Sequence, residues 1–144
     1  MKTKVLALDV YGTLLPTYGK SIKRKGLEFF LSKCKFNRLI ICACSDGKTQ
    51  DVKKNLSEAG IDLKYFDKYF EMPRQPGNFT KQPKEFRPIL SHYNLSPYEL
   101  TIIGDRKERD IEPAEKLGCN AILVPEYRTI NDKDYFDMNK IEVP

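Results

Sequence analysis

The amino-acid sequence predicts an α/β domain built on a Rossmann-like, doubly wound parallel sheet. Four short apolar runs carry Val, Ile and Leu on consecutive positions instead of alternating ones, as strands covered on both faces do. Stretches with the apolar spacing of helices lie between these runs. Strands that alternate with helices favour parallel pairing through right-handed crossovers, so we expect one sheet with helices on both faces.

The predicted strands are short and bounded by turn-forming residues. They are the runs at residues 5–10, 39–44, 100–103 and 121–124. Ser96 and Glu99 form the pattern of a capping box, with Pro97 at the first helical position. A brief helical turn should therefore come directly before the third run.

The predicted helices carry apolar residues three or four positions apart. The sets that mark them are Ile22, Leu27, Phe30, Leu31 and Cys34; Val52, Leu56 and Ala59; and Phe86, Ile89, Leu90 and Tyr93. A last helix covers residues 114–117 and ends at Gly118.

The chain of 144 residues has the length of one domain. We expect a single domain over residues 1–144, with its core at about residues 4–125 and an irregular C-terminal tail at residues 126–144, where clear periodicity is lost. Residues 72–83 hold three prolines and a glycine, which indicates a loop.

The composition favours a cytoplasmic protein. No stretch approaches the roughly 18 apolar residues of a membrane span, and Asp9 interrupts the first apolar run, so we expect neither a membrane span nor a signal peptide. The four cysteines form no CxxC pair and are expected to be buried thiols. The net charge is +5, and its one cluster, residues 23–25, is expected to be a solvated face, so nucleic acid is not indicated as a partner.

Polar residues follow three of the predicted strands where each strand ends. Asp9 ends the first run, Ser45 and Asp46 follow the second, and Asp105 and Asp110 follow the third. In doubly wound sheets the functional groups collect at the carboxyl ends of the strands. We therefore expect these five side chains at one edge of the sheet.

Three aspartates at one edge repel one another unless a hard cation lies between them, and Mg²⁺ takes carboxylate, water and phosphate oxygens. A loop lysine and a serine hydroxyl would suit the oxygens of a phosphoryl group. One aspartate could then attack phosphorus.

The alternative is a structural role for these acids, because Asp46 and Asp110 could each be a helix N-cap. Arg106 and Arg109, beside the last two acids, could either steer an anionic substrate or balance nearby acids.

The chain resembles the haloacid dehalogenase (HAD) superfamily, whose members are mostly Mg²⁺-dependent phosphatases and phosphotransferases with an aspartyl intermediate. Its first motif appears as LALDVYGTLL, with Asp9 at the nucleophile position and Thr13 at the threonine position. The second motif appears as LIICACS and ends at Ser45, and the fourth appears as TIIGDRKERDI and supplies Asp105 and Asp110.

The third motif, a lysine in a loop before a helix, appears as FTKQPKEFRPIL with a register one residue short. We take Lys81 as this lysine and Lys84 as its substitute. The resemblance then implies a complete set of site residues. They are Asp9, Ser45 and Lys81 in catalysis; Asp9, Tyr11, Asp105 and Asp110 around Mg²⁺; and Tyr11, Thr13, Asp46, Gly47, Lys84 and Arg106 around the substrate.

Two departures from the family pattern bear on function. The segments that would carry a cap domain are too short for one, so the chain resembles a capless member with an open site. Such a site favours a large, even macromolecular, phosphorylated substrate, or a partner subunit that covers it, which makes a homo-oligomer a hypothesis.

The second departure is Tyr11, which stands where family phosphatases have an acid that protonates the leaving oxygen and then activates water. A phenol with pKa near 10 is a poor substitute for help worth roughly 10² to 10⁴ in rate. The chain is therefore predicted to be a slow HAD-type phosphoric monoester hydrolase, with Asp46 or a substrate group as the acid, or a phosphate- and metal-binding module with little turnover.

A metal-independent dehalogenase is a further alternative. That branch tends to show D-x-Y-G-T and a serine followed by Asn-Gly, against DVYGT and Ser45-Asp46-Gly47 in this chain. Dehalogenases hold the halide largely through cap residues and tend to lack the acids at Asp105 and Asp110. The phosphatase interpretation is therefore preferred.

Overall fold

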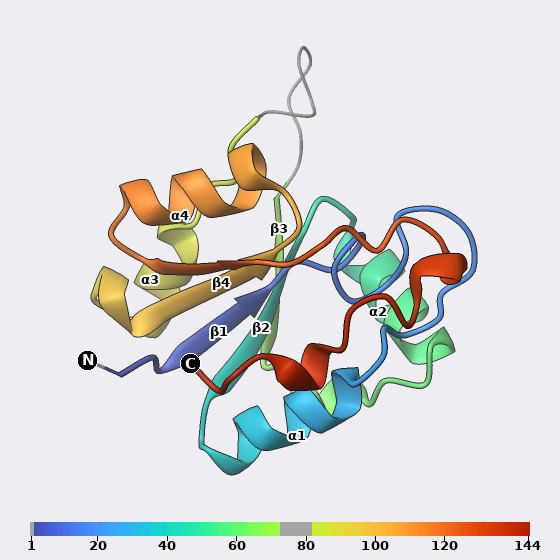
Figure 1. Cartoon of the computed structure of the whole chain (residues 1–144). Coiled ribbons are helices and arrows are strands. Elements are labelled where there is room, and N and C mark those ends of the chain that lie inside the picture. The colour runs from blue at the N-terminus through green and yellow to red at the C-terminus, as the bar shows by residue number, and fades with distance from the viewer. Residues whose placement is uncertain (1, 73–81) are drawn as a thin grey trace.

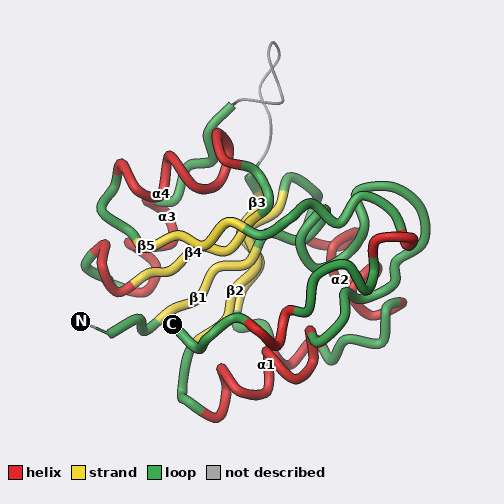
Figure 2. Tube along the Cα trace, in the orientation of Figure 1, coloured by secondary structure: helices red, strands yellow, loops and turns green. Residues whose placement is uncertain are grey.

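The structure is a computed structural model that describes residues 2–72 and 82–144. Within these residues five parallel strands form one sheet in the order β3-β2-β1-β4-β5 (Figure 2). The strands are β1 (Val5–Leu8), β2 (Ile40–Ser45), β3 (Lys68–Glu71), β4 (Leu100–Gly104) and β5 (Asn120–Leu123). The predicted doubly wound parallel sheet is confirmed.

The order of the strands places the expected site between β1 and β4. The chain runs outward from β1 through β2 to β3 and then returns to the other side of β1 with β4 and β5. Val5 of β1 pairs in register with Ile40 of β2 and with Leu100 of β4. The carboxyl ends of the three central strands are therefore level, and the winding reverses where Asp9 and Asp105 follow their strands.

Helices cover both faces of the sheet (Figure 1). On one face, α1 (Leu27–Phe36) and α2 (Thr49–Glu58) share a core with Leu6, Leu8 and Ile41 of the strands. On the other face, α3 (Arg87–Tyr93) and α4 (Glu112–Lys116) pack on a second core. Its strand residues are Val5, Ala7, Cys42, Cys44, Leu100 and Ile102. Burial on both faces explains why the central strands are apolar at consecutive positions.

The segments that could carry a cap are short. One helix lies between β1 and β2, and, outside residues 73–81, the chain from β2 to β4 forms α2, β3 and α3 without a further domain. Among the described residues, no helix has the length and apolar character needed to cross a bilayer.

The C-terminal residues pack against the domain without forming an α-helix or strand. Residues 126–144 contain two 3₁₀ turns, Ile130–Asp132 and Met138–Lys140, and pass back along α1 (Figure 1). Tyr127, Met138 and Ile141 are buried in this tail.

The expectation of a solvated basic face at residues 23–25 is wrong for Arg24, which is 1% exposed. Its guanidinium donates to the carbonyls of Thr13 and Pro125 and lies over the rings of Tyr127 and Phe136.

Candidate active site

Three aspartates meet at the carboxyl edge of the sheet. One carboxylate oxygen from each of Asp9, Asp105 and Asp110 lies within 4.8 Å of the others. Asp9 follows β1 and its N–H donates to the carbonyl of Ile103 in β4 at 3.0 Å. Asp110 comes from a π-helical turn, Lys107–Ile111, which turns its side chain back toward β4. The predicted gathering of these acids is confirmed.

Thr13 connects two of the carboxylates. Its Oγ1 lies 2.9 Å from Asp9 Oδ2 and 3.1 Å from Asp105 Oδ1, so its single proton can serve either oxygen. The tight turn that carries Thr13 is closed by the carbonyl of Val10, which accepts from the N–H groups of Thr13, Leu14 and Leu15.

Two glycines allow the acids to approach the backbone closely. A Cβ at Gly12 would lie 2.7 Å from Asp105 Oδ2, and its φ of +90° disfavours any larger residue. A Cβ at Gly104 would lie 2.5 Å from Asp110 Cγ. Glycine at both positions is therefore a requirement of the carboxylate cluster.

Lys84 completes the cluster. Its Nζ lies 2.7 Å from Asp9 Oδ1, 2.7 Å from Asp110 Oδ1 and 3.0 Å from the carbonyl oxygen of Cys44. The side chain is 2% exposed, so these groups replace its solvent shell. Lys84, named above as the substitute, thus occupies the site, whereas Lys81 lies outside the described residues.

The cluster holds more negative charge than one lysine neutralises. Burial and the charge of Asp9 raise the pKa of Asp105 to about 8 and that of Asp110 to about 6. Burial opposes the charged forms of Asp9 and Lys84 as well, but their mutual attraction lowers the pKa of Asp9 and raises the pKa of Lys84. Without a metal, the site therefore keeps a proton on Asp105 near neutral pH.

This arrangement fits a hard divalent cation. Three converging carboxylates supply oxygen ligands, and the raised pKa of Asp105 reports the excess negative charge that a cation would neutralise. Asp9, Asp105 and Asp110 are the residues that would hold Mg²⁺.

Tyr11 is directed away from the carboxylates and toward α2. Its hydroxyl accepts a hydrogen bond from Asn55 Nδ2 at 2.5 Å, and a Cβ at Gly47 would lie 3.1 Å from its ring. Burial raises the pKa of the phenol. The group of Tyr11 left for the predicted metal contact is therefore its backbone carbonyl, and this contact stays a prediction. Nothing in the sequence had indicated Asn55 as the partner of the Tyr11 hydroxyl.

The residues at the end of β2 and just after it bond to neighbouring groups. Ser45 is buried, and its Oγ accepts from the Gly47 N–H at 3.2 Å. Asp46 forms an ion pair with Arg109.

The N-cap alternative is wrong for Asp46, because the N-cap of α2 is Lys48. It is also wrong for Asp110, whose Oδ2 accepts from the backbone N–H of Arg106 while α4 begins after Ile111.

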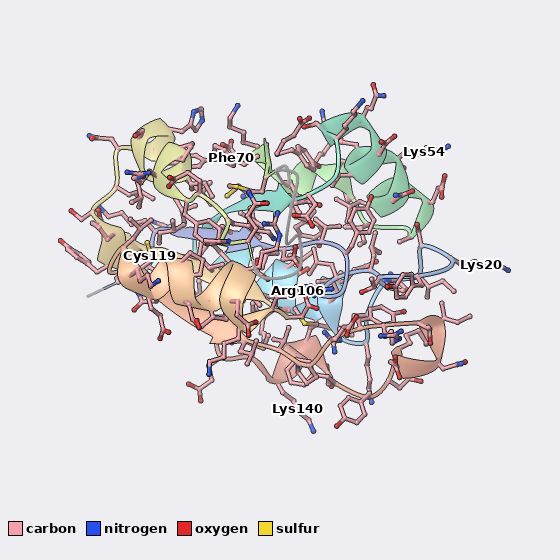
Figure 3. The ribbon with its side chains drawn as sticks, turned by 90° about the horizontal axis from the view of Figure 1, so that it is seen from above. Lys20, Lys54, Phe70, Arg106, Cys119 and Lys140 are labelled. Atoms are coloured by element: carbon pink, nitrogen blue, oxygen red, sulfur yellow. The ribbon has the colours of Figure 1, made fainter. Side chains whose placement is uncertain are left out.

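The two arginines beside the acids have different surroundings. Arg106, which directly follows Asp105, is partly exposed and is labelled near the centre of the view from above in Figure 3. Arg109 is 1% exposed and does not face solvent. Of the two alternatives for Arg109, its burial disfavours substrate steering, and the acid that it pairs with is Asp46. The substrate role of Arg106 stays a prediction.

Comparison with known proteins agrees with the motifs. Residues 82–132 match a family model described as HAD-hydrolase-like. None of the curated protein sequences matches the chain.

Solved structures share the fold at identities below 25%. An uncharacterized protein from Listeria monocytogenes serotype 4b is 22% identical with a TM-score of 0.68, over 84% of this chain and 78% of that one. A predicted phosphoglycolate phosphatase from Haemophilus somnus 129PT is 15% identical with a TM-score of 0.69, over 98% and 89%. L-2-haloacid dehalogenase from Xanthobacter autotrophicus is 12% identical with a TM-score of 0.60, over 85% and 77%.

The fold and the carboxylate cluster thus define a HAD-like α/β protein. The resemblance to the HAD superfamily is confirmed, because residues 82–132 carry the family's sequence pattern and the described residues carry its fold.

Proposed function

We propose that this chain is a Mg²⁺-dependent HAD-type phosphoric monoester hydrolase in which Asp9 is the nucleophile. The observation that carries the proposal is the convergence of Asp9, Asp105 and Asp110 within 4.8 Å, with Lys84 in contact with two of them. The neighbouring phosphatase and dehalogenase structures support hydrolase chemistry only through the shared fold.

Asp9 is suited to attack because its carboxylate is kept ionised and oriented. Lys84 contacts Oδ1, and Thr13 donates to Oδ2. Attack forms a bond between a carboxylate oxygen and phosphorus, and the ester oxygen leaves with the bonding electrons. Water then attacks phosphorus and releases phosphate, which restores Asp9.

The remaining residues would bind the phosphoryl group. The Ser45 hydroxyl, at the end of β2, accepts from the Gly47 N–H and would donate its own proton to a phosphoryl oxygen. Lys84 lies beside Asp9 and would exchange one of its three present acceptors for a phosphoryl oxygen. Mg²⁺ held by the three aspartates would neutralise the charge of the phosphoryl oxygens.

Leaving-group protonation has two candidate acids, Tyr11 and Asp46, and each bonds to a neighbouring side chain. The Tyr11 hydroxyl accepts from Asn55 in α2, and burial raises the pKa of this phenol, which makes it a weak acid at neutral pH. Asp46 would have to give up its ion pair with Arg109 to act as the acid. General-acid help is worth roughly 10² to 10⁴ in rate. Alkyl phosphates should therefore react more slowly than aryl phosphates by about that range, and equal rates for both would contradict this account.

The test of the proposal is hydrolysis of an aryl phosphate with and without Mg²⁺. We expect activity that requires the metal and falls by about 10³-fold or more in Asp9→Asn. Asp134→Asn, which changes an exposed carboxylate in the C-terminal tail, is the matched control and should keep the wild-type rate. Activity that survives Asp9→Asn would disprove the assignment of the nucleophile.

A second candidate is a phosphate- and metal-binding module with little turnover. It is favoured by the orientation of Tyr11, whose phenol is held by Asn55 and not by a group of the carboxylate cluster. Mg²⁺ binding without hydrolysis of aryl phosphates would support this candidate over the first.

A dehalogenase receives less support, because halide displacement by an aspartate needs no metal and gives no role to the cluster of Asp105 and Asp110. Halide release from a 2-haloacid in the absence of Mg²⁺ would favour the dehalogenase.

The absence of a cap in the described residues favours a large phosphorylated substrate for the proposed phosphatase.

A further inference from the structure

Arg109 is a buried cation that the proposed chemistry does not use. It lies in the π-helical turn directly before Asp110, and only 1% of its surface is exposed. Its Nη1 donates to the carbonyl of Gln82 at 2.7 Å and its Nη2 to the carbonyl of Met72 at 2.6 Å. Its Nε donates to Asp46 Oδ1 at 3.0 Å, and Nη2 completes the ion pair with the same oxygen.

These acceptors come from three different segments of the carboxyl edge. Asp46 directly follows β2, Met72 directly follows β3, and Gln82 leads into the segment that carries Lys84. The backbone of Arg109 adds a fourth connection, because its carbonyl accepts from the N–H of Lys84 at 2.9 Å. One residue therefore ties the site lysine to the ends of two strands.

The guanidinium is suited to this task in a way that other cations are not. It carries five donors in a rigid plane and can bond to acceptors on different sides at once. Burial of its charge is costly unless the donors are satisfied, so the arrangement favours one conformation of the surrounding backbone. An ammonium at the end of a lysine chain would reach only some of these acceptors.

We propose that Arg109 is a positioning residue that holds Lys84 against Asp9 and Asp110. It acts on catalysis through the placement of Lys84 and does not contact the substrate. Its catalytic consequence rests on the proposed function, whereas its effect on the placement of Lys84 does not.

The test uses Arg109→Met and Arg109→Lys in the full chain, with Asp46→Asn as a milder change that keeps both carbonyl contacts. Arg87→Met is the matched control, because Arg87 lies in the same segment as Lys84 but forms an exposed pair with Glu85. All variants are compared in saturating Mg²⁺.

The first measurement is acylation of Lys84 by an amine-reactive reagent, located by peptide mass spectrometry. We expect Lys84 to be protected in the wild type and in Arg87→Met, since its side chain is 2% exposed. Labelling should rise by about tenfold in both Arg109 variants and by less in Asp46→Asn. If Arg109→Met fails to fold, Arg109→Lys and Asp46→Asn decide the result.

The second measurement separates kcat from KM on an aryl phosphate. A displaced catalytic group costs up to about 10²-fold in rate, so kcat should fall by roughly 10- to 100-fold in the Arg109 variants with KM changed by less than about threefold. The Kd for Mg²⁺ alone should stay within about twofold of the wild type, because Thr13 still donates to Asp9 and Asp105, and the Arg106 N–H still donates to Asp110.

The inference is overturned if Lys84 stays protected in folded Arg109 variants, or if Lys84 becomes labelled while kcat equals that of Arg87→Met. A wild-type protein without hydrolase activity would refute the proposed function, and the labelling result would still decide whether Arg109 positions Lys84.

Discussion

In the metal-free protein we expect Asp105 to carry a proton near neutral pH, which Mg²⁺ would displace on binding to the proposed site. In the metal-free protein, burial and the charge of Asp9 raise the pKa of Asp105 to about 8, and the pKa of Asp110 is raised to about 6. In the proposed site both carboxylates would bind Mg²⁺ in their ionised forms. The affinity for Mg²⁺ should therefore rise as the pH increases from 6 to 8.5, with proton release on binding.

Isothermal titration calorimetry with Mg²⁺ at pH 6.5 and pH 8.5 measures this change. Titrations in two buffers of different ionisation enthalpy report the number of protons released. An affinity that does not depend on pH in this range would contradict the assigned protonation of Asp105.

Asp105 is also predicted to reduce the stability of the metal-free protein. The pKa of Asp105 in the folded state lies above its usual value of 3.8, so stability is lost as the pH rises from about 4 to about 8. Asp105→Asn should therefore stabilise the metal-free protein at pH 8.5 by about 1–2 kcal/mol, a Tm increase of a few degrees. It should also remove the stabilisation by Mg²⁺.

Thermal unfolding at pH 8.5 and pH 5 provides the measurement and its control. At pH 5 the Asp105 carboxyl is already protonated, so the variant should have little effect there. A variant that is less stable than the wild type at pH 8.5 would show that repulsion among the carboxylates is not the dominant effect.

Residue-level prediction from the sequence succeeded where a residue follows a buried strand. Asp9, Asp105 and Asp110 each follow an apolar run or its turn, and parallel winding brings such positions together. The partners of Tyr11 and Arg109 could not be predicted, because Asn55 and Asp46 are remote in sequence and no local pattern marks them.

The local register did not decide between the two lysine candidates of the third motif. Both Lys81 and Lys84 precede α3, and the motif spacing alone favoured the first. The signal that favoured Lys84 was its short distance to α3. Lys84 lies two residues before Phe86, which is buried and is the N-cap of that helix.

At the scale of elements, apolar runs predicted the strands whose faces are both covered. β1, β2 and β4 are buried almost throughout, and each was expected from its sequence. β3 was missed because it is an edge strand with exposed Lys68 and Glu71 at its ends, so it contains no apolar run.

The C-terminal tail contributes buried side chains to the folded core, beyond the core expected at about residues 4–125. Tyr127 is fully buried, its N–H donates to the carbonyl of Gly12 at 2.7 Å, and its ring faces Arg24. Tyr127→Ala should lower the free energy of unfolding by about 3–5 kcal/mol, as for other large buried aromatics. Urea denaturation gives this value.

Tyr135→Ala is the matched control in the same tail, because Tyr135 is 75% exposed. It should change stability by less than about 0.5 kcal/mol. Equal stability of the two variants would mean that the tail does not pack as described.

At the scale of the whole molecule, the winding order of the sheet explains why the site lies at the edge between β1 and β4. The alternation of strands and helices was enough to predict this architecture. The sequence pattern does not specify what covers an open site, because a lid can come from the substrate or from a second subunit.

Association of two or more copies remains our hypothesis for covering the site. Light scattering on the purified chain should then give a multiple of 16.7 kDa. A mass equal to one chain would exclude a stable homo-oligomer and leave a large substrate as the cover.

The central claim is that Asp9 attacks phosphorus and that Tyr11 cannot supply the base for the second step. The most direct measurement is acid quenching during turnover of an aryl phosphate with Mg²⁺, followed by peptide mass spectrometry. We expect a phosphoryl group on the peptide that contains Asp9, which accumulates because hydrolysis of the intermediate is slow. Turnover without any phosphorylated peptide, or with the phosphoryl group on another residue, would contradict it.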